Sequence, residues 1–139
     1  GESMEPTLEN NDKIVITNLF YKPAQGDVIV LRKKSFLDET IVKRVIATEG
    51  QTVNVDFITH QVWVDGILLD DPYIKAPISK SGDVAFPVTV PEGYVFVLGD
   101  NRNNSADSRL SRLGMIDKRY ILGHVIYRVF PFDQIGSIG

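Results

Sequence analysis

The 139-residue sequence contains no cysteine and only two histidines. The absence of cysteine excludes thiol catalysis, disulfide bonds and thiolate metal sites. No run of roughly 18 apolar residues occurs, so we expect no transmembrane helix within these residues. Basic residues are also few: 15 Lys and Arg against 18 Asp and Glu give a net charge of −3. This balance argues against a nucleic-acid partner, because a phosphate backbone is met by clustered cations.

The residues that are present favour a mostly β protein with one compact core. Runs of Val, Ile, Tyr and Phe are separated at short intervals by Gly, Pro, Asn and Asp, which is typical of strands and turns. Helical turns are expected only at Asn104–Leu113 and at Ile116–Tyr120, the second begun by Asp117. The predicted strands are Lys13–Thr17, Asp27–Leu31, Glu39–Thr48, Thr52–Asp56, Gln61–Val64, Val88–Val90, Tyr94–Gly99 and Gly123–Val129.

A small β lobe is predicted within the middle of the chain. Residues 57–64 indicate a hairpin, and Asp65-Gly66 indicates a second turn. Residues 69–87 then form a polar stretch interrupted by Pro and Gly. We therefore expect a small inserted β lobe at 51–91 and a β core made of residues 1–50 and 92–139.

The first candidate for chemistry is Ser3, in Gly1-Glu2-Ser3-Met4-Glu5-Pro6-Thr7-Leu8. Alone, a serine near a Pro-containing turn decides nothing. His60 lies in the predicted hairpin and His124 starts an apolar strand, and neither has an acidic residue at a suggestive spacing. We expect both histidines to be structural, which leaves few candidates for a His-based serine triad.

The second candidate is Lys43, at the centre of the apolar strand Ile41–Ala47. A strand that is apolar on both faces is buried on both sides, so two adjacent cations there must be paired or one must be neutral. Arg44 is effectively always charged and needs a carboxylate partner. Period-two geometry assigns the side chains to two faces: Ile41, Lys43, Val45 and Ala47 on one, and Val42, Arg44 and Ile46 on the other.

Two interpretations of Lys43 stay open on the residues alone. Complete burial lowers a lysine pKa by about 3–5 units from about 10.4, and a lysine tuned to about 7–8 is a competent general base. In the alternative interpretation, the amine reaches water from the strand edge while its stem packs against apolar neighbours.

The third candidate is the polar loop Gly99–Arg109, which follows an apolar strand. Its alternating Asp and Asn residues suggest a calcium loop, but Arg102 falls on a ligand position and makes that interpretation poor. A surface turn is the ordinary expectation for such a composition.

Taken together, these segments resemble the conserved boxes of the bacterial type I signal peptidases, the Ser/Lys peptidases that remove secretory signal sequences. The order along the chain also agrees with that family. The resemblance implies two antiparallel β-sheet lobes, with the catalytic lobe built from both ends of the chain. The matching segments are Ser3–Leu8, Gly26–Leu31, Lys43–Ile46 and Gly99–Arg109.

By position, the resemblance implies that Ser3 is the nucleophile and Lys43 the general base, with Ser105 orienting the lysine amine. It implies no metal and no organic cofactor. Two ion pairs are implied as structural support: Arg44 with Asp100, and Asp107 with Arg109.

The resemblance also implies the substrate and the location. Preprotein signal peptides with small residues at the first and third positions before the cut are the expected substrates, lying beside the strand Glu39–Lys43. We expect the domain on the extracytoplasmic face of the bacterial cytoplasmic membrane, touching the bilayer, with its membrane anchor missing from this chain. The residues expected to line two shallow apolar pockets are Met4, Leu8, Ile14, Val30, Ile41 and Val42.

The sequence departs from the commonest family pattern at two positions. Asn103 replaces a frequent Asp, with no catalytic role attached. Gly1 stands where some members have a hydroxyl residue of the oxyanion hole, so stabilisation is expected to rest mainly on the Ser3 backbone N–H. Two alternative functions are a self-cleaving Ser/Lys regulator of the SOS-repressor type and a catalytically silent β module. The Pro6-Thr7-Leu8 continuation and the last box argue against the first, and the presence of both Ser3 and Lys43 argues against the second.

Overall fold

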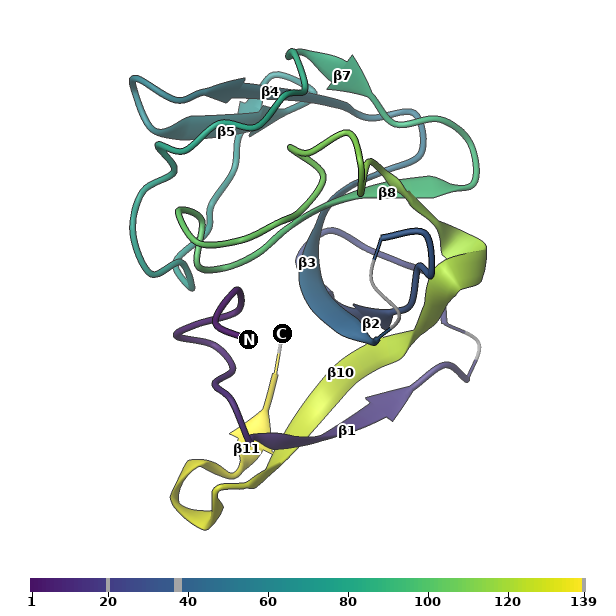
Figure 1. The fold of residues 1–139 in the computed structure, drawn as a ribbon, viewed down its shortest axis with the longest axis vertical. Helices are drawn as coiled ribbons and strands as arrows, with labels where there is room; N and C mark the ends of the chain where they lie inside the picture. The colour runs from purple at the N-terminus through teal and green to yellow at the C-terminus, as the bar shows by residue number, and fades with distance from the viewer. Residues whose placement is uncertain (20, 37–38, 139) are drawn as a thin grey trace.

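The computed structural model describes residues 1–19, 21–36 and 39–138, and it is nearly all β (Figure 1). Two antiparallel sheets and two short 3-10 helices, η1 (Lys118–Tyr120) and η2 (Phe132–Gln134), make up its regular structure. The mostly β prediction is confirmed. The strands are β1 (Lys13–Thr17), β2 (Val28–Leu31), β3 (Ile41–Thr48), β4 (Thr52–Asp56), β5 (Gln61–Val64), β6 (Ile67–Leu68), β7 (Val88–Thr89), β8 (Tyr94–Leu98), β9 (Ile116–Asp117), β10 (Ile121–Phe130) and β11 (Gly136–Ser137).

The larger sheet has seven strands and joins the two ends of the chain. Its order is β1-β10-β2-β3-β8-β9, with β11 also paired to β10. The long strand β10 pairs with β1 along one part of its length and with β2 along another, and it runs as one curved ribbon in Figure 1. β3 lies between β2 and β8, so both of its edges are hydrogen-bonded to neighbouring strands.

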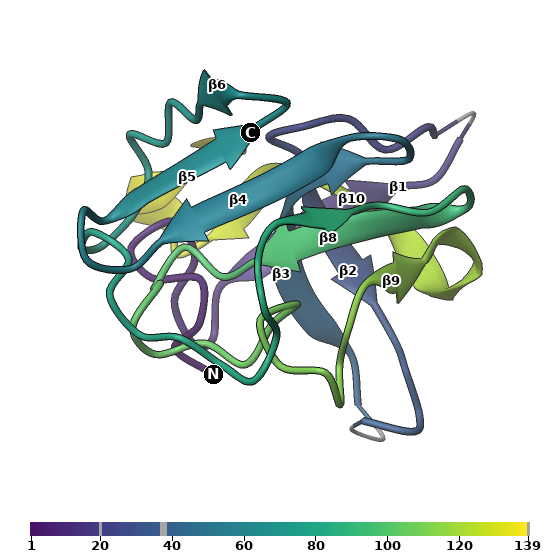
Figure 2. The ribbon, with the colours of Figure 1, turned by 90° about the horizontal axis from the view of Figure 1, so that it is seen from above.

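The smaller sheet has the order β6-β5-β4-β7, and all four of its strands lie within residues 51–91. It stacks beside β8 and β3 in Figure 2. The predicted hairpin and the turn at Asp65-Gly66 are confirmed, and both turn residues have positive φ, 51° and 76°. A shared apolar cluster joins the sheets, with Ile46 and Phe96 from the larger one and Val53 from the smaller.

One helical prediction is wrong and the other is partly right. Residues 104–113 form successive turns, because their backbone is used by the sheet: the Ser108 N–H donates to the Val97 carbonyl at 3.1 Å. In the second segment, Ile116–Asp117 is strand β9, and only Lys118–Tyr120 is helical. Asp117 begins that turn as predicted, since its carboxylate accepts from the Arg119 N–H at 2.9 Å.

Strand β3 is buried on both faces from Lys43 to Ala47, as its apolar pattern predicts. The assignment of Ala47 to the face of Lys43 is wrong. A register irregularity between Val45 and Ala47 turns Ala47 to the other side. Ala47 therefore packs with Ile46, whereas Val45 packs in a separate cluster. The bulge needs one extra residue on β3, and the residue pattern does not announce it.

Candidate active site

The segment that carries Ser3 is anchored by apolar side chains and by the loop after β8. Met4 and Leu8 are buried beneath it in one cluster with side chains of β2 and β10. The Asn101 N–H donates to the Ser3 carbonyl at 2.8 Å, and the Asn101 side-chain amide donates to the Glu2 carbonyl at 3.1 Å. Ser3 is thereby held at a fixed place against residues that lie far away in the sequence.

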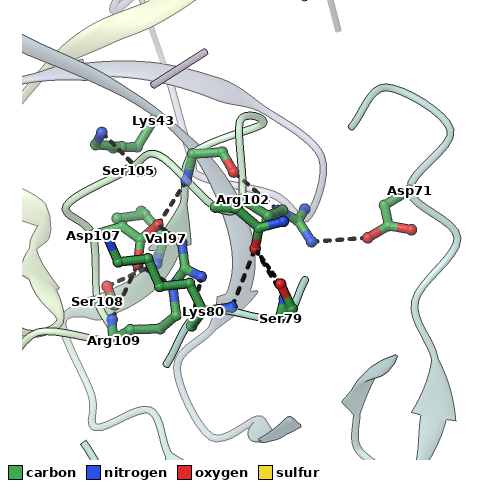
Figure 3. A network of polar contacts seen from close by, with 12 residues as sticks. Lys43, Asp71, Ser79, Lys80, Val97, Arg102, Ser105, Asp107, Ser108 and Arg109 are labelled. Atoms are coloured by element: carbon green, nitrogen blue, oxygen red, sulfur yellow. Dashed lines mark hydrogen bonds and ion pairs between the residues drawn. The ribbon is translucent and has the colours of Figure 1, made fainter. Parts of the chain in front are cut away.

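Lys43 is buried at the centre of β3, with only 4% of its surface exposed. Its amine donates to the Ser105 hydroxyl at 3.1 Å, the contact drawn in Figure 3. Burial lowers the pKa of this lysine to about 8, even though the Asp107 carboxylate acts to raise it; Arg109 adds to the lowering. The amine does not reach open water from a strand edge. A substantial fraction of Lys43 is consequently neutral near pH 8.

The loop from Gly99 to Ser105 approaches both Ser3 and Lys43 closely. A Cβ on Gly99 would lie 2.2 Å from the Ser105 hydroxyl oxygen and 2.6 Å from the Ser3 carbonyl oxygen. Only glycine leaves space for this three-way contact. The Arg102 side chain donates to the Gly99 carbonyl at 2.9 Å and to Asp71 at 2.9 Å, which ties the loop to the segment before β7.

Arg44 and Asp100 form a buried ion pair on the opposite face of β3. Two hydrogen bonds, of 2.9 and 2.8 Å, join the guanidinium to both carboxylate oxygens. The guanidinium also lies 3.6 Å from the centre of the Tyr73 ring. Asp100 accepts a further hydrogen bond of 2.5 Å from the Thr7 hydroxyl, so the same carboxylate holds the Ser3 segment and β3 together.

Asp107 and Arg109 form the second buried ion pair, with hydrogen bonds of 2.8 and 2.7 Å (Figure 3). Asp107 also accepts from the Gly99 N–H at 3.0 Å. Both carboxylates, Asp100 and Asp107, are bound to arginines, so neither is free to hold a cation. No group of three or more potential metal ligands occurs in the part of the chain that the structure describes.

Asn103 has a structural role that explains why an amide is accommodated there. Its side-chain oxygen accepts from the backbone N–H groups of Ser79 and Lys80 at 2.9 and 3.1 Å, while its NH2 donates to the Pro77 carbonyl at 3.0 Å. A carboxylate could accept the first two bonds but could not donate the third.

The two histidines lie outside this cluster. His60 occupies a turn with a φ of 62°, and its Nδ1 lies 2.9 Å from the Ile78 carbonyl oxygen. The His124 ring packs on Tyr21 at 4.2 Å between centroids. Neither contacts Ser3, Lys43 or Ser105 in the hydrogen bonds found for the described residues.

A groove of about 380 Å³ runs beside Ser3 and Lys43, and both residues line it. Five of the six apolar residues predicted to form the substrate pockets also line this groove. Val30 does not line this groove; it is buried in the apolar cluster that also contains Met4 and Leu8. The five lining residues are Met4, Leu8, Ile14, Ile41 and Val42.

The sequence did not predict four residues that support the site: Thr7, Tyr73, Asn101 and Arg102. Thr7, Asn101 and Arg102 act through hydrogen bonds to partners more than 30 positions away or to backbone groups, and Tyr73 through a ring contact. The density of polar residues from Asp100 to Arg102 is the one sequence signal of a loop held by polar contacts. The structure shows the result: Arg102 is only 1% exposed and donates to Asp71.

Comparisons of the sequence and of the structure with known proteins point to one family. The pattern of the family described as "Signal peptidase, peptidase S26" matches residues 1–130. The chain is 38% identical to the "Probable signal peptidase I-1" of Synechocystis sp., over all of this chain and 72% of that protein. It is 36% identical to the "Signal peptidase I" of Bacillus amyloliquefaciens, over 97% of this chain and 75% of that protein. The crystal structure of a signal peptidase I from Enterococcus faecalis V583 superposes with a TM-score of 0.59 at 28% identity, covering 75% of this chain and 97% of that one.

Proposed function

Since the chain belongs to the signal peptidase family, peptidase S26, and is a serine endopeptidase that cleaves signal peptides from preproteins, we propose that Ser3 and Lys43 are its catalytic pair. The observation that carries this proposal is the position of the Lys43 amine. It is buried, it is held by Ser105 at 3.1 Å, and it lies on the wall of a groove that Ser3 also lines. A buried lysine without a bound carboxylate is suited to accept a proton from a serine.

The proposed reaction has two stages. The Ser3 hydroxyl oxygen attacks the scissile carbonyl while neutral Lys43 takes the hydroxyl proton, and the lysine then gives that proton to the leaving amine. Water, activated by the same neutral lysine, next hydrolyses the acyl-enzyme and frees Ser3. Ser105 is a positioning residue, because its hydrogen bond limits the directions in which the amine can point.

The Ser3 backbone N–H is the proposed donor to the oxyanion. Among the described residues this N–H has no protein acceptor, so it is available to a developing negative charge. Gly1 supplies no side-chain hydroxyl for the same purpose. Losing one donor of this kind elsewhere costs about 2.7–4 kcal/mol of transition-state stabilisation. We expect Gly1→Ser to raise kcat.

The five apolar lining residues support the expected preference for small side chains at the first and third positions before the cut. A substrate strand placed against the start of β3 gains main-chain hydrogen bonds, and alternate side chains then point into the groove. Rates measured on a peptide series with Ala, Leu and Phe at the first position before the cut check this. Equal rates for Ala and Phe would overturn the pocket assignment.

A membrane contact is proposed at two exposed apolar sites that lie beyond opposite ends of β1, Leu19 after Thr17 and the Phe130–Phe132 pair beside Lys13. Leu19 and Phe132 are 74% and 77% exposed, and Phe130 packs edge-to-face against Phe132 at 5.5 Å. Exposed apolar side chains of this kind favour a bilayer surface. Phe20, the next residue after Leu19, lies outside the described residues. No helix long and apolar enough to span a bilayer occurs in the described ranges.

These exposed apolar side chains support contact with a membrane surface; the extracytoplasmic face of the bacterial cytoplasmic membrane is proposed from the family alone. Co-sedimentation with anionic lipid vesicles tests the contact. The wild type is expected to bind more than the double variant Phe130→Ser, Phe132→Ser. Equal binding by two equally stable proteins would place the contact elsewhere.

Cleavage of a signal-peptide substrate tests the catalytic pair. General-base catalysis contributes about 10²–10⁴-fold, so Lys43→Met should lose at least about 100-fold in kcat, and Ser3→Ala should not form an acyl-enzyme. The rate of the wild type should rise with pH through about 8, as Lys43 loses its proton. A serine-reactive probe that labels the wild type but not Ser3→Ala separates an active peptidase from a silent β module. Near-normal cleavage by Lys43→Met would refute the assignment.

A further inference from the structure

A second groove, of about 320 Å³, begins where the first one ends. Ala106 lines both grooves, and Ser105, the hydrogen-bond partner of Lys43, lines the second. Arg112 lines the second groove while its guanidinium lies 5.1 Å from the ring centre of Phe36, which lines the first. The two grooves therefore adjoin each other beside Lys43 and Ser105.

The two grooves carry opposite charge. Apart from Lys43, the ionised side chains that line the first groove are the carboxylates of Glu9, Asp12 and Glu39; Asp12 is balanced by Arg128 at 3.5 Å, which leaves Glu9 and Glu39. Those that line the second are all cations, Lys80, Arg109 and Arg112.

Lys80 and Arg112 are the cations that remain available to a ligand. Arg109 is balanced by Asp107 beneath it. Within the described part of the chain, neither Lys80 nor Arg112 has an ion-pair partner. Asp83, which Ser111 holds through two hydrogen bonds of 2.8 and 2.5 Å, adds one negative charge in the neighbourhood of Arg112. Lys80 and Arg112 are both exposed, so their charges face solvent and whatever enters the groove.

We propose that the second groove binds the residues that follow the scissile bond, and that Lys80 and Arg112 favour acidic over basic side chains at the start of the mature protein. This inference rests on the proposed function. A cleaved chain must leave the site in two directions, and the apolar first groove takes the signal-peptide side. The second groove is the continuation on the other side of Ser105, so the leaving amine and the residues after it lie there.

The backbone around the second groove is held by contacts that do not involve the Lys80 and Arg112 side chains. The Lys80 carbonyl accepts from the Arg109 side chain at 2.7 Å, two residues labelled in Figure 3, and the Lys80 N–H donates to the Asn103 side chain at 3.1 Å. Gly82 lies so close to the Arg109 carbonyl that a Cβ would be 2.2 Å from its oxygen. Replacing Lys80 and Arg112 by glutamate therefore reverses the charge of the groove and leaves its backbone in place.

The test uses three peptides with one signal sequence and with Asp-Asp, Asn-Asn or Lys-Lys at the second and third positions after the cut. The wild type should cleave the Asp-Asp peptide about five- to tenfold faster in kcat/KM than the Lys-Lys peptide at low ionic strength, because two exposed ion pairs contribute modestly. The ratio should shrink in 0.5 M salt. The double variant Lys80→Glu, Arg112→Glu should reverse the order, so that the Lys-Lys peptide is cleaved faster than the Asp-Asp peptide.

The matched control is the double variant Lys22→Glu, Arg119→Glu, which makes the same charge change on exposed residues outside both grooves. It should keep the wild-type order. Equal rates for the Asp-Asp and Lys-Lys peptides in the wild type, or reversal by the control as well, would overturn the proposal while leaving the proposed function intact. Failure of the wild type to cleave any of the three peptides would instead overturn the proposed function, and this inference with it.

Discussion

The two faces of β3 bury cations at neighbouring positions, yet only one of these cations is set to lose its proton. Arg44 meets Asp100 through two hydrogen bonds, so its charge is balanced. Lys43 meets the neutral hydroxyl of Ser105, and the carboxylate that favours its charged form, Asp107, is already bound by Arg109. The comparison teaches that burial makes a base of a lysine only where no carboxylate binds the amine directly.

The largest expected effect comes from removing the Asp100 carboxylate, the partner of Arg44 on the other face of β3. Asp100→Asn keeps the shape but leaves Arg44 charged and buried, which typically costs about 3–5 kcal/mol of the free energy of unfolding. Urea denaturation at pH 7 measures it. Glu49→Gln, in an exposed pair with Lys118, is the control and should change stability by less than about 1 kcal/mol. Equal losses for the two variants would contradict the asymmetry.

On the face of β3 that carries Lys43, removing the cation is expected to raise the free energy of unfolding. Below pH 8 the folded protein must hold a buried charged Lys43, and at about 1.4 kcal/mol per pKa unit the difference between about 8 and 10.5 corresponds to about 3 kcal/mol. Lys43→Met should therefore be more stable than the wild type at pH 7. Its advantage should fade between pH 8 and 10.5, where the folded lysine is neutral and the unfolded one is still protonated. Denaturation at several pH values tests this, with Lys22→Met as the control; an advantage that does not vary with pH would refute it.

Gly99→Ala tests whether activity depends on the close approach of Gly99 to Ser105 and Ser3. The added Cβ must push away the Ser105 hydroxyl or the Ser3 carbonyl. A misplacement of about 1 Å costs about 100-fold in rate. Gly136→Ala, where a Cβ meets nothing within 4 Å, is the matched control and should keep full kcat. Equal kcat values for the two variants would show that the loop can retreat without loss.

The smallest expected effect sharpens the comparison on the paired face alone. Thr7→Val removes one hydrogen bond to Asp100, and a bond to a charged group contributes about 1.5–3 kcal/mol. Because Arg44 still holds the carboxylate, we expect a loss near 1.5 kcal/mol in the free energy of unfolding. The pH at which activity is half-maximal should stay unchanged, since Lys43 is untouched. A shift of that midpoint would mean that the two faces are electrostatically coupled.

Much of the architecture could be predicted because it depends on local pattern. The apolar run around Lys43 indicates a strand buried on both sides, and the Asp-Gly pair indicates a turn, and both are present. The bulge that turns Ala47 depends on the register of β8, which no local pattern contains. The boundaries proposed for the inserted lobe stay a prediction, because its strands share an apolar cluster with the larger sheet.

The site was predictable to a different extent. The need of Arg44 for a carboxylate follows from burial, whereas the choice of Asp100 came from resemblance. Residues 104–113 satisfy a local helix pattern, but tertiary hydrogen bonds such as Ser108 to Val97 determine their backbone. Val30 is buried in the cluster of Met4 and Leu8 without lining the groove, which its place in an apolar strand does not reveal. The roles of Ser3, Lys43 and Ser105 remain predictions for the experiments above.

The clasp that Asn101 forms on the Ser3 segment has a consequence for the order of folding. Its side-chain amide bonds a carbonyl 99 positions away, and closing so long a loop is entropically costly, so such contacts tend to form late. A half-folded chain can pair β2 with β3, which holds Lys43, and still lack Ser3 at its final place. With Ser3 as the proposed nucleophile, we expect the chain to be inactive until its two ends have met. On gentle heating, hydrolysis should cease while the β-sheet circular dichroism signal is still intact.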